Sequence, residues 1–215
     1  KKPFDYKQII SFMQPRLIAG VESIKHETYM RTFRTEKARG WFSVSDKPES
    51  SALELKISGS DIRCYMEIYY RVRRMFDLDT DFDSINRQLG SDAMLARGIP
   101  HAHVPRMPVA YDPFEFVIRA VLGQQITVQA ATTLAGRIAE NCTIAVEDAP
   151  EGLRYYFPDA KELADADISN IGITKTRQQT IQTVCNAVID GTLMLNHNQN
   201  FENFSKQFGA LKGIG

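Results

Sequence analysis

The period of the hydrophobic pattern changes along the chain, and this change limits the folds that the sequence can form. Apolar and polar residues alternate strictly at 52–57 and roughly at 28–34, and 40–44 is a short aromatic run. A period of two indicates half-buried strands, so we predict three antiparallel strands here. From about Asp81 onward every periodic segment has helical spacing. The sequence therefore predicts an α+β protein, with an N-terminal domain of antiparallel sheet and helices at 1–80 and an all-α domain at 81–215.

Two helices are expected beside the strands. Residues 5–18 place apolar residues on one helical stripe, and Asp61 is positioned to cap a helix that continues through Phe76. The arginines of this second helix lie mostly off its apolar stripe, which is typical of a solvated face and less often of a face turned to DNA. The predicted inward stripe consists of Ile62, Tyr65, Met66, Tyr69, Val72 and Phe76.

The second part of the chain contains well-marked helix starts and stops. Asp112 at the N-cap is followed by Pro113 and Glu115, a pattern that predicts a helix ending at Gly123. Further helices are predicted from about Thr127, as two short turns between 159 and 171, at 174–190 with Gly191 as the C-cap, and at 200–208.

The sequence Leu211-Lys212-Gly213-Ile214-Gly215 is typical of a helix-hairpin-helix turn. Two glycines around one apolar residue let the backbone turn sharply and come close to a ligand. A helix that starts after such a turn points free N–H groups outward, which makes an anion site suited to a nucleic-acid phosphate. The alternative interpretation is an ordinary glycine C-cap of the preceding helix.

Composition excludes DNA binding through a global positive charge. Lys plus Arg and Asp plus Glu each number 26, so any DNA contact must rely on local geometry. The three cysteines are far apart and lack metal-ligand spacing, which fits free thiols in a reducing compartment. With no membrane-length apolar stretch and no signal peptide, we expect a cytoplasmic protein without a membrane partner. His101 and His103 have no acidic or cysteine neighbours and are interpreted as loop histidines.

A longer stretch carries a family resemblance. The segment from Tyr111 to Ala131 resembles the helix, loop and helix of AlkA-type 3-methyladenine DNA glycosylases. The N-terminal helix and strands, the Gly172–Arg177 helix start and Gly191–Leu193 look like their counterparts in that family, in the same order. The resemblance implies that the all-α part is a helix-hairpin-helix DNA glycosylase domain. It also implies base excision repair, in which the N-glycosidic bond of an alkylated base in double-stranded DNA is hydrolysed after base flipping, without a redox cofactor.

The resemblance assigns roles to the loop between the two helices of this segment. In the family, a side chain that follows Leu122-Gly123-Gln124 fills the space left by the flipped base, and the aligned residue here is Gln125. Ile126 is the second candidate for this plug. The alternative is that Gln124 and Gln125 only cap the ends of the two helices.

At the hairpin, the resemblance implies contacts with the DNA backbone. Amides around Gly213 and Gly215 face phosphates, and Lys212 adds a positive charge where many hairpins carry proline. The implied ligands of a monovalent cation, which would strengthen the grip, are the backbone carbonyls of Gly209, Leu211 and Ile214.

The family's catalytic aspartate lies beyond the hairpin glycines, so the resemblance assigns a catalytic role to no residue of this chain. Asp112, Asp165 and Asp167 do not occupy the matching position. The sequence is therefore expected to be a glycosylase truncated at the hairpin and inactive as it stands. Two alternatives remain open, a non-catalytic helix-hairpin-helix DNA-binding module and an 8-oxoguanine-type glycosylase of the same superfamily. The preferred lesion and the oligomeric state are not predicted.

Overall fold

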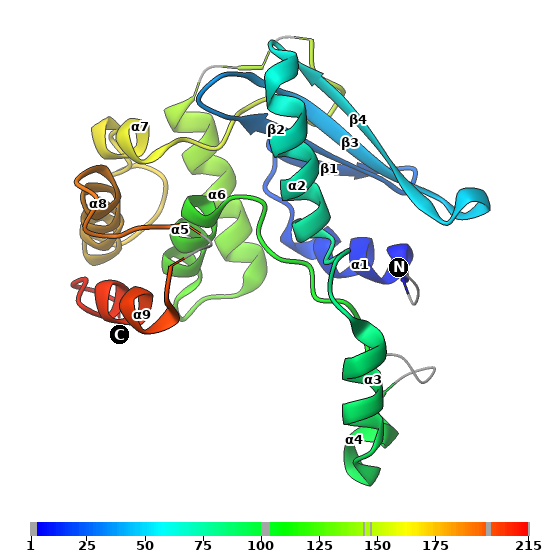
Figure 1. Ribbon diagram of the computed structural model, residues 1–215. Helices are drawn as coiled ribbons and strands as arrows, with labels where there is room; N and C mark the ends of the chain where they lie inside the picture. Colours follow the sequence, from blue (N-terminus) through cyan, green and yellow to red (C-terminus); the bar gives the residue numbers. More distant parts are fainter. Residues whose placement is uncertain (1–3, 100–103, 144, 147, 197–198, 215) are drawn as a thin grey trace.

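The computed structural model describes residues 4–99, 104–143, 145–146, 148–196 and 199–214 (Figure 1). In its N-terminal part, one antiparallel sheet has the order β1-β2-β3-β4, so each strand pairs with the next along the chain. The three predicted strands are present, and the middle one is longer than expected. The strands are β1 (Glu22–Lys25), β2 (Thr28–Arg34), β3 (Arg39–Lys47) and β4 (Ala52–Gly59).

The sequence analysis missed strand β1. It has only four residues, and it pairs with β2 over its whole length, from Glu22 opposite Arg31 to Lys25 opposite Thr28. This register buries the carboxylate-bearing Glu22, which is not a residue that a strand pattern puts inside. The pairing partner, rather than the residues of β1, therefore determines this strand.

Helices and short 3-10 turns accompany the sheet, and α2 runs across it in Figure 1. The apolar stripe predicted for residues 5–18 lies on α1 and faces the core of this part. The Tyr6 hydroxyl donates a hydrogen bond of 2.6 Å to the Val44 carbonyl, which ties α1 to β3. The elements are α1 (Tyr6–Met13), η1 (Gln14–Arg16), η2 (Pro48–Ser50), η3 (Ile62–Cys64) and α2 (Tyr65–Met75).

The inward stripe predicted for residues 62–76 is wrong in its first turns. Ile62, Met66 and Tyr69 are exposed, Ile62 by 74%, whereas Ile68 is completely buried. The element begins as the 3-10 helix η3, which has three residues per turn, so its phase differs from that of a continuous α-helix. Cys64 rather than Ile62 consequently faces the core. The buried residues of η3, α2 and the residue that follows are Cys64, Ile68, Val72, Met75 and Phe76.

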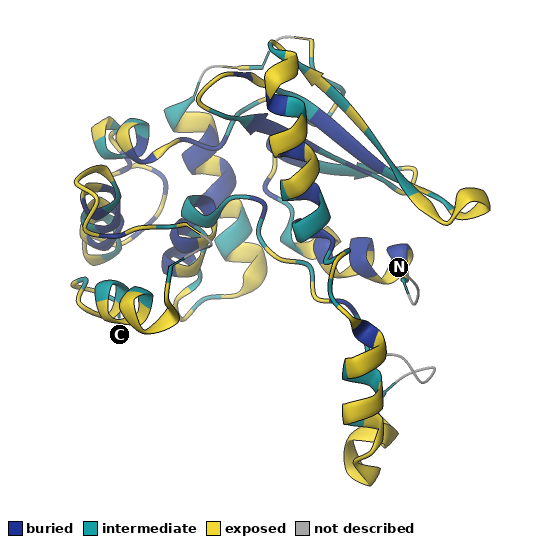
Figure 2. Cartoon of the chain, in the orientation of Figure 1, coloured by how far each residue is buried: buried dark blue, intermediate teal, exposed yellow. Residues whose placement is uncertain are grey.

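The helices α3 (Phe82–Gly90) and α4 (Ala93–Gly98) form an arm that projects from the rest of the molecule (Figure 1). Figure 2 shows that most of this arm is exposed. The chain then returns to the sheet, where Tyr111 packs against Phe42 with ring centroids 5.2 Å apart. The two hydrophobic cores each contain residues from both sides of position 80. The domain boundary that the sequence places there stays a prediction. His101 and His103 lie outside the described residues.

The helices that follow residue 112 carry the predicted N-caps. Asp112 accepts a hydrogen bond of 2.9 Å from the Glu115 amide, and Thr127 and Thr174 cap their helices in the same way. One helix forms where two short turns were expected between 159 and 171. The observed architecture is α+β, as predicted, and no helix within the described ranges has the length and apolarity to span a bilayer. The helices are α5 (Pro113–Gly123), α6 (Val128–Cys142), α7 (Ala160–Asp165), α8 (Lys175–Ile189) and α9 (Phe201–Gly209).

The burial of α2 can be checked with one pair of substitutions. We expect Ile68→Ala to lower the free energy of unfolding by about 2–5 kcal/mol, because it leaves a cavity in a packed core. Ile62→Ala changes the same side chain at an exposed site and should alter that free energy by less than about 0.5 kcal/mol. Urea denaturation followed by circular dichroism measures both values. Equal losses for the two variants would contradict the assigned orientation of α2.

Candidate functional site

A groove of about 400 Å³ lies between α1 and η1 on one side and α5 and α6 on the other. Its walls are mostly apolar, and buried charged side chains form its floor. The residues used below are Phe12 and Arg16 on the first wall, Gly123, Ile126 and Thr127 on the second, and Glu22, Arg31, Glu115 and Arg119 at the floor.

The first wall presents an aromatic ring at the rim of the groove. Phe12 is 40% exposed, and the Arg16 guanidinium lies over its ring at 3.8 Å from the centroid. Arg16 Nη1 also donates a hydrogen bond of 2.6 Å to the Phe12 carbonyl. The 3-10 turn η1, with Pro15 in its first turn, directs the chain so that this side chain folds back on α1. The stacked pair forms a planar surface of the kind on which nucleobases stack.

The second wall ends in the loop that joins α5 to α6. Gln125 has φ of +57°, a left-handed conformation that is uncommon for a residue with a side chain. Gln124 and Gln125 are exposed, whereas Ile126 is half-buried against the helical core. The Thr127 side chain caps α6 by accepting from the Ala130 amide, so neither glutamine side chain performs that cap. The plug role of Gln125 stays a prediction, and its exposure and strained backbone agree with it.

The predicted hairpin turn packs directly against α8. Gly213 has φ of +92°, and a Cβ at this position would lie 2.1 Å from Thr180 Oγ1. The turn is closed by a hydrogen bond of 3.1 Å from the Ile214 amide to the Leu211 carbonyl. Lys212 is exposed, and Gly215 lies outside the described residues.

The loop and the hairpin turn meet around a second hollow of about 520 Å³. Gln124 Nε2 donates to the Gly213 carbonyl at 3.4 Å, and Arg177 Nη2 donates to the Gln124 carbonyl at 2.6 Å. The structure thus brings together Gln124, Gln125, Gly213 and Ile214, which the sequence had placed in two separate motifs. Their contacts with DNA stay predictions.

Sequence analysis missed Arg177 as part of this assembly. Lys175 and Arg177 both lie in the first turn of α8, where the positive end of the helix dipole disfavours cations. Two basic residues in that turn are a signal that an anion or another acceptor lies nearby. Phe12 and Arg16 carry no comparable signal, because only the tertiary fold brings them to the groove.

The predicted cation ligands fit a cation chemically. The carbonyl of Gly209 belongs to the last turn of α9, where helix carbonyls lack helical partners and carry partial negative charge. The Leu211 carbonyl accepts one hydrogen bond and keeps a second lone pair. With Ile214 these groups remain a predicted site for a monovalent cation. In the part of the chain that the structure describes, no cluster of three or more His, Cys, Asp or Glu residues could hold a metal ion.

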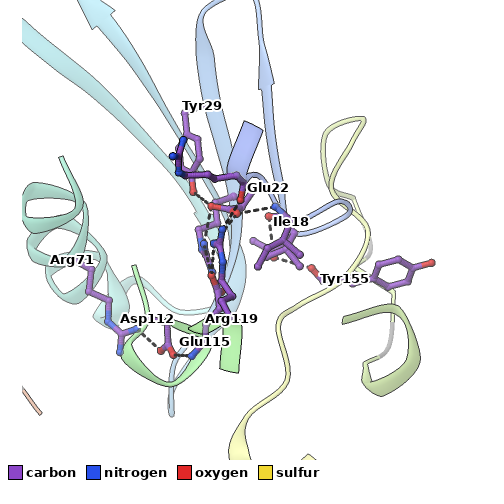
Figure 3. A network of polar contacts seen from close by, with 12 residues as sticks. Ile18, Glu22, Tyr29, Arg71, Asp112, Glu115, Arg119 and Tyr155 are labelled. Carbon is purple, nitrogen blue, oxygen red and sulfur yellow. Dashed lines mark hydrogen bonds and ion pairs between the residues drawn. The ribbon is translucent and has the colours of Figure 1, made fainter. Parts of the chain in front are cut away.

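A buried ionic cluster forms the floor of the groove (Figure 3). Arg31 Nη1 lies 3.0 Å from Glu22 Oε1, and the Arg31 guanidinium also pairs with Glu115. Arg119 Nη1 lies 3.3 Å from Glu115 Oε1 and 3.6 Å from Glu22 Oε2. The Tyr29 hydroxyl donates to Glu22 at 2.6 Å. Two carboxylates and two guanidinium groups balance in charge, in a position where Arg31 is 3% and Glu115 2% exposed.

The two carboxylates of the cluster have unequal environments. Burial raises the pKa of Glu22, but the charges of Arg31 and Arg119 and the hydrogen bond from Tyr29 outweigh it and place this pKa below its ordinary value. Burial raises the pKa of the Glu115 carboxyl above its ordinary value. The charge of Arg31 lowers this pKa, but the neighbouring negative charge of Glu22 offsets part of that effect. Both carboxylates are ion-paired, so neither is offered to a substrate. Asp112 accepts a hydrogen bond from the Glu115 amide at the start of α5, and Asp167 accepts one from the Ser169 amide two residues on.

The arrangement of sheet, helices and hairpin defines a known class of fold. It is similar to the solved structure of a 3-methyladenine DNA glycosylase from Archaeoglobus fulgidus, with a TM-score of 0.76 and 16% sequence identity. The superposition covers 99% of this chain and 72% of that chain. The sequence of residues 1–112, more than half of the chain, matches the AlkA N-terminal domain family. The chain belongs to this family, as the resemblance had indicated.

Two curated relatives are similar along the whole chain. One, from Mycobacterium tuberculosis, is named "Probable bifunctional transcriptional activator/DNA repair enzyme AlkA" and is 31% identical over 215 residues. This chain spans 43% of its length. The other is the DNA-3-methyladenine glycosylase 2 of Escherichia coli, which is 26% identical over 216 aligned residues. This alignment covers 99% of the present chain and 74% of the relative.

The close packing of the hairpin predicts an unequal response of two glycines. Gly213→Ala should lower the free energy of unfolding by about 1–3 kcal/mol, because alanine is strained in this backbone region and its methyl group meets Thr180. Gly209→Ala is the control, since a Cβ there meets nothing within 4 Å. It should leave stability unchanged or raise it by up to about 1 kcal/mol. Thermal unfolding measures both changes, and a neutral Gly213→Ala would show that the turn is not held as described.

Proposed function

We propose that the protein acts in base excision DNA repair and hydrolyses the N-glycosidic bond of an alkylated base that has been flipped out of duplex DNA. One observation carries the proposal: an apolar groove with an aromatic rim ends at an exposed loop that contains the left-handed residue Gln125, and this loop is hydrogen-bonded to the turn at Gly213. Base flipping requires a pocket for the base, a side chain that fills the position left empty in the duplex, and contacts with the DNA phosphate backbone.

The groove suits a planar base. Its volume of about 400 Å³ lies within the usual range for small-ligand sites, and its walls are mainly apolar. Phe12 and Arg16 offer a stacking surface at the rim. The names of the relatives and of the solved structure support alkylated purines of the 3-methyladenine type as substrates. Hydrolysis uses water as the second reactant, so the proposed reaction needs no redox cofactor.

Local charges compensate for the zero net charge of the chain. Lys212 is exposed on the hairpin turn, and Arg177 contacts the neighbouring loop at Gln124. Together with the amides of the turn, they support binding of the phosphate backbone of double-stranded DNA at this face. A monovalent cation held by hairpin carbonyls would add to this grip. We assign no catalytic residue among positions 1–215, since the carboxylates at the groove are engaged in ion pairs.

A DNA substrate also bears on where the protein works. We propose that the protein works in the cytoplasm, in a cell whose chromosome lies in that compartment. The three cysteines are free thiols, which fits a reducing compartment.

The proposal is tested by base release from methylated duplex DNA under single-turnover conditions, with the natural protein that contains this sequence. Gln125→Ala should slow release while the affinity for undamaged duplex changes little, because the plug acts only when the base is extruded. Gln125→Leu should keep or raise release, since an apolar wedge fills the same gap. Gln88→Ala, an exposed glutamine on the α3–α4 arm, serves as the control.

Two results would count against this scheme. No release of an alkylated base by the natural protein would overturn the proposed function. Normal release by Gln125→Ala, combined with loss in Gln124→Ala or Ile126→Ala, would move the plug to another residue.

The hairpin is tested through the salt dependence of DNA binding. Lys212→Ala should weaken binding to all sequences and reduce the slope of log K against log salt by about one, the loss of one phosphate contact. Lys161→Ala removes an exposed lysine on α7 and should leave the slope unchanged. Fluorescence anisotropy over a salt series gives both slopes. The same slope for Lys212→Ala and the unmodified protein would exclude a phosphate contact at Lys212.

A further inference from the structure

The ionic cluster at the floor of the groove is an expensive way to hold two parts of a protein together. Glu22 and Arg31 come from the sheet, and Glu115 and Arg119 come from α5. Glu22, Arg31 and Glu115 are buried, and desolvating these charges costs so much that a packed apolar cluster of similar size is often at least as stable. What the charged cluster provides is directional contacts, which fix the position of the groups that they join.

Arg119 is the member that extends the cluster to the wall of the groove. Its Nη1 contacts Glu115 at 3.3 Å and Glu22 at 3.6 Å (Figure 3). Its Nη2 donates a hydrogen bond to the backbone carbonyl of Arg16, more than a hundred residues away in sequence. Arg16 is the last residue of η1, and its own side chain stacks on Phe12. A single side chain therefore connects the sheet, α5 and the aromatic wall.

We propose that Arg119 is a positioning residue, which fixes the Phe12–Arg16 wall at a set distance from α5 and so sets the width of the groove that takes the base. This inference rests on the proposed function of the groove. Glu115 holds the guanidinium of Arg119 from one turn earlier on the same helix, so its carboxylate acts through Arg119. The opposite wall, which includes Gly123, Ile126 and Thr127, continues from the same helix. The positions of both walls are thereby fixed relative to α5.

The variant Arg119→Met keeps most of the side-chain volume and removes the three polar contacts. We expect single-turnover release of the alkylated base to fall by about 10²-fold, the scale that a misplacement of about 1 Å produces. Affinity for undamaged duplex should not change, because the hairpin and loop remain in place. Amide hydrogen exchange should become faster in residues 14–18 and stay unchanged in β2. Arg119→Lys, which keeps the charge but not the branched geometry, should recover part of the release rate.

The matched control is Arg34→Met. Arg34 also joins the sheet to the helical part, through an ion pair with Glu162 at the start of α7, and it does not line the groove. It should leave base release and the exchange of residues 14–18 unchanged. If Arg119→Met does not fold, the charge-balanced double variant Glu115→Gln with Arg119→Met replaces it.

The outcomes separate this inference from the proposed function. All variants are made in the natural protein that contains this sequence, and absence of base release by that protein without substitutions would overturn the proposed function and this inference with it. Release by the unmodified protein, with either normal release by Arg119→Met or unaltered exchange at 14–18, would overturn only the positioning role. Equal losses in Arg119→Met and Arg34→Met would also overturn it, because any sheet-to-helix ion pair would then have the same effect.

Discussion

The buried pairing of Arg31 with Glu22 and Glu115 is the constraint on which the rest of the structure depends. Arg31 comes from β2, its partners come from β1 and α5, and all three are buried. A lone charge at this depth would be strongly destabilising, so the sheet and the helix can pack only in the arrangement that brings the partners together. The cluster therefore fixes the angle and register at which the helical part meets the sheet.

From this junction, α5 extends to the face that we propose for DNA. Its first turn carries Glu115 in the cluster, and its last residue, Gly123, leads into the loop with Gln125. The same face receives the hairpin turn, which Gly213 allows to approach Thr180 on α8. Loop and turn are joined through Gln124. One helix thus connects the buried ionic cluster to the exposed geometry of the candidate site.

Sequence analysis recovered the features that depend on neighbouring residues. The helix starts at Asp112, Thr127 and Thr174 are found where their capping side chains predicted them. Three of four strands were located as well, and a turn is present at Leu211–Ile214. The analysis failed for β1, which is defined by its pairing with β2. It also failed for η3, where the 3-10 start turns Cys64 rather than Ile62 toward the core. The roles of Gln125, Lys212 and the hairpin carbonyls remain predictions.

The sequence alone determined the α+β class, the capped starts of α5, α6 and α8 and the family to which the chain belongs, because caps, periodicity and motifs are local properties of the chain. Only the tertiary structure decided that Phe12 and Arg16 face the loop after Gly123, and that Arg177 supports that loop. It also paired Arg31 with a carboxylate 84 positions away. The physical reason is that burial of charge is a property of the assembled fold, so no pattern of nearby residues reveals which charges will share one dry site.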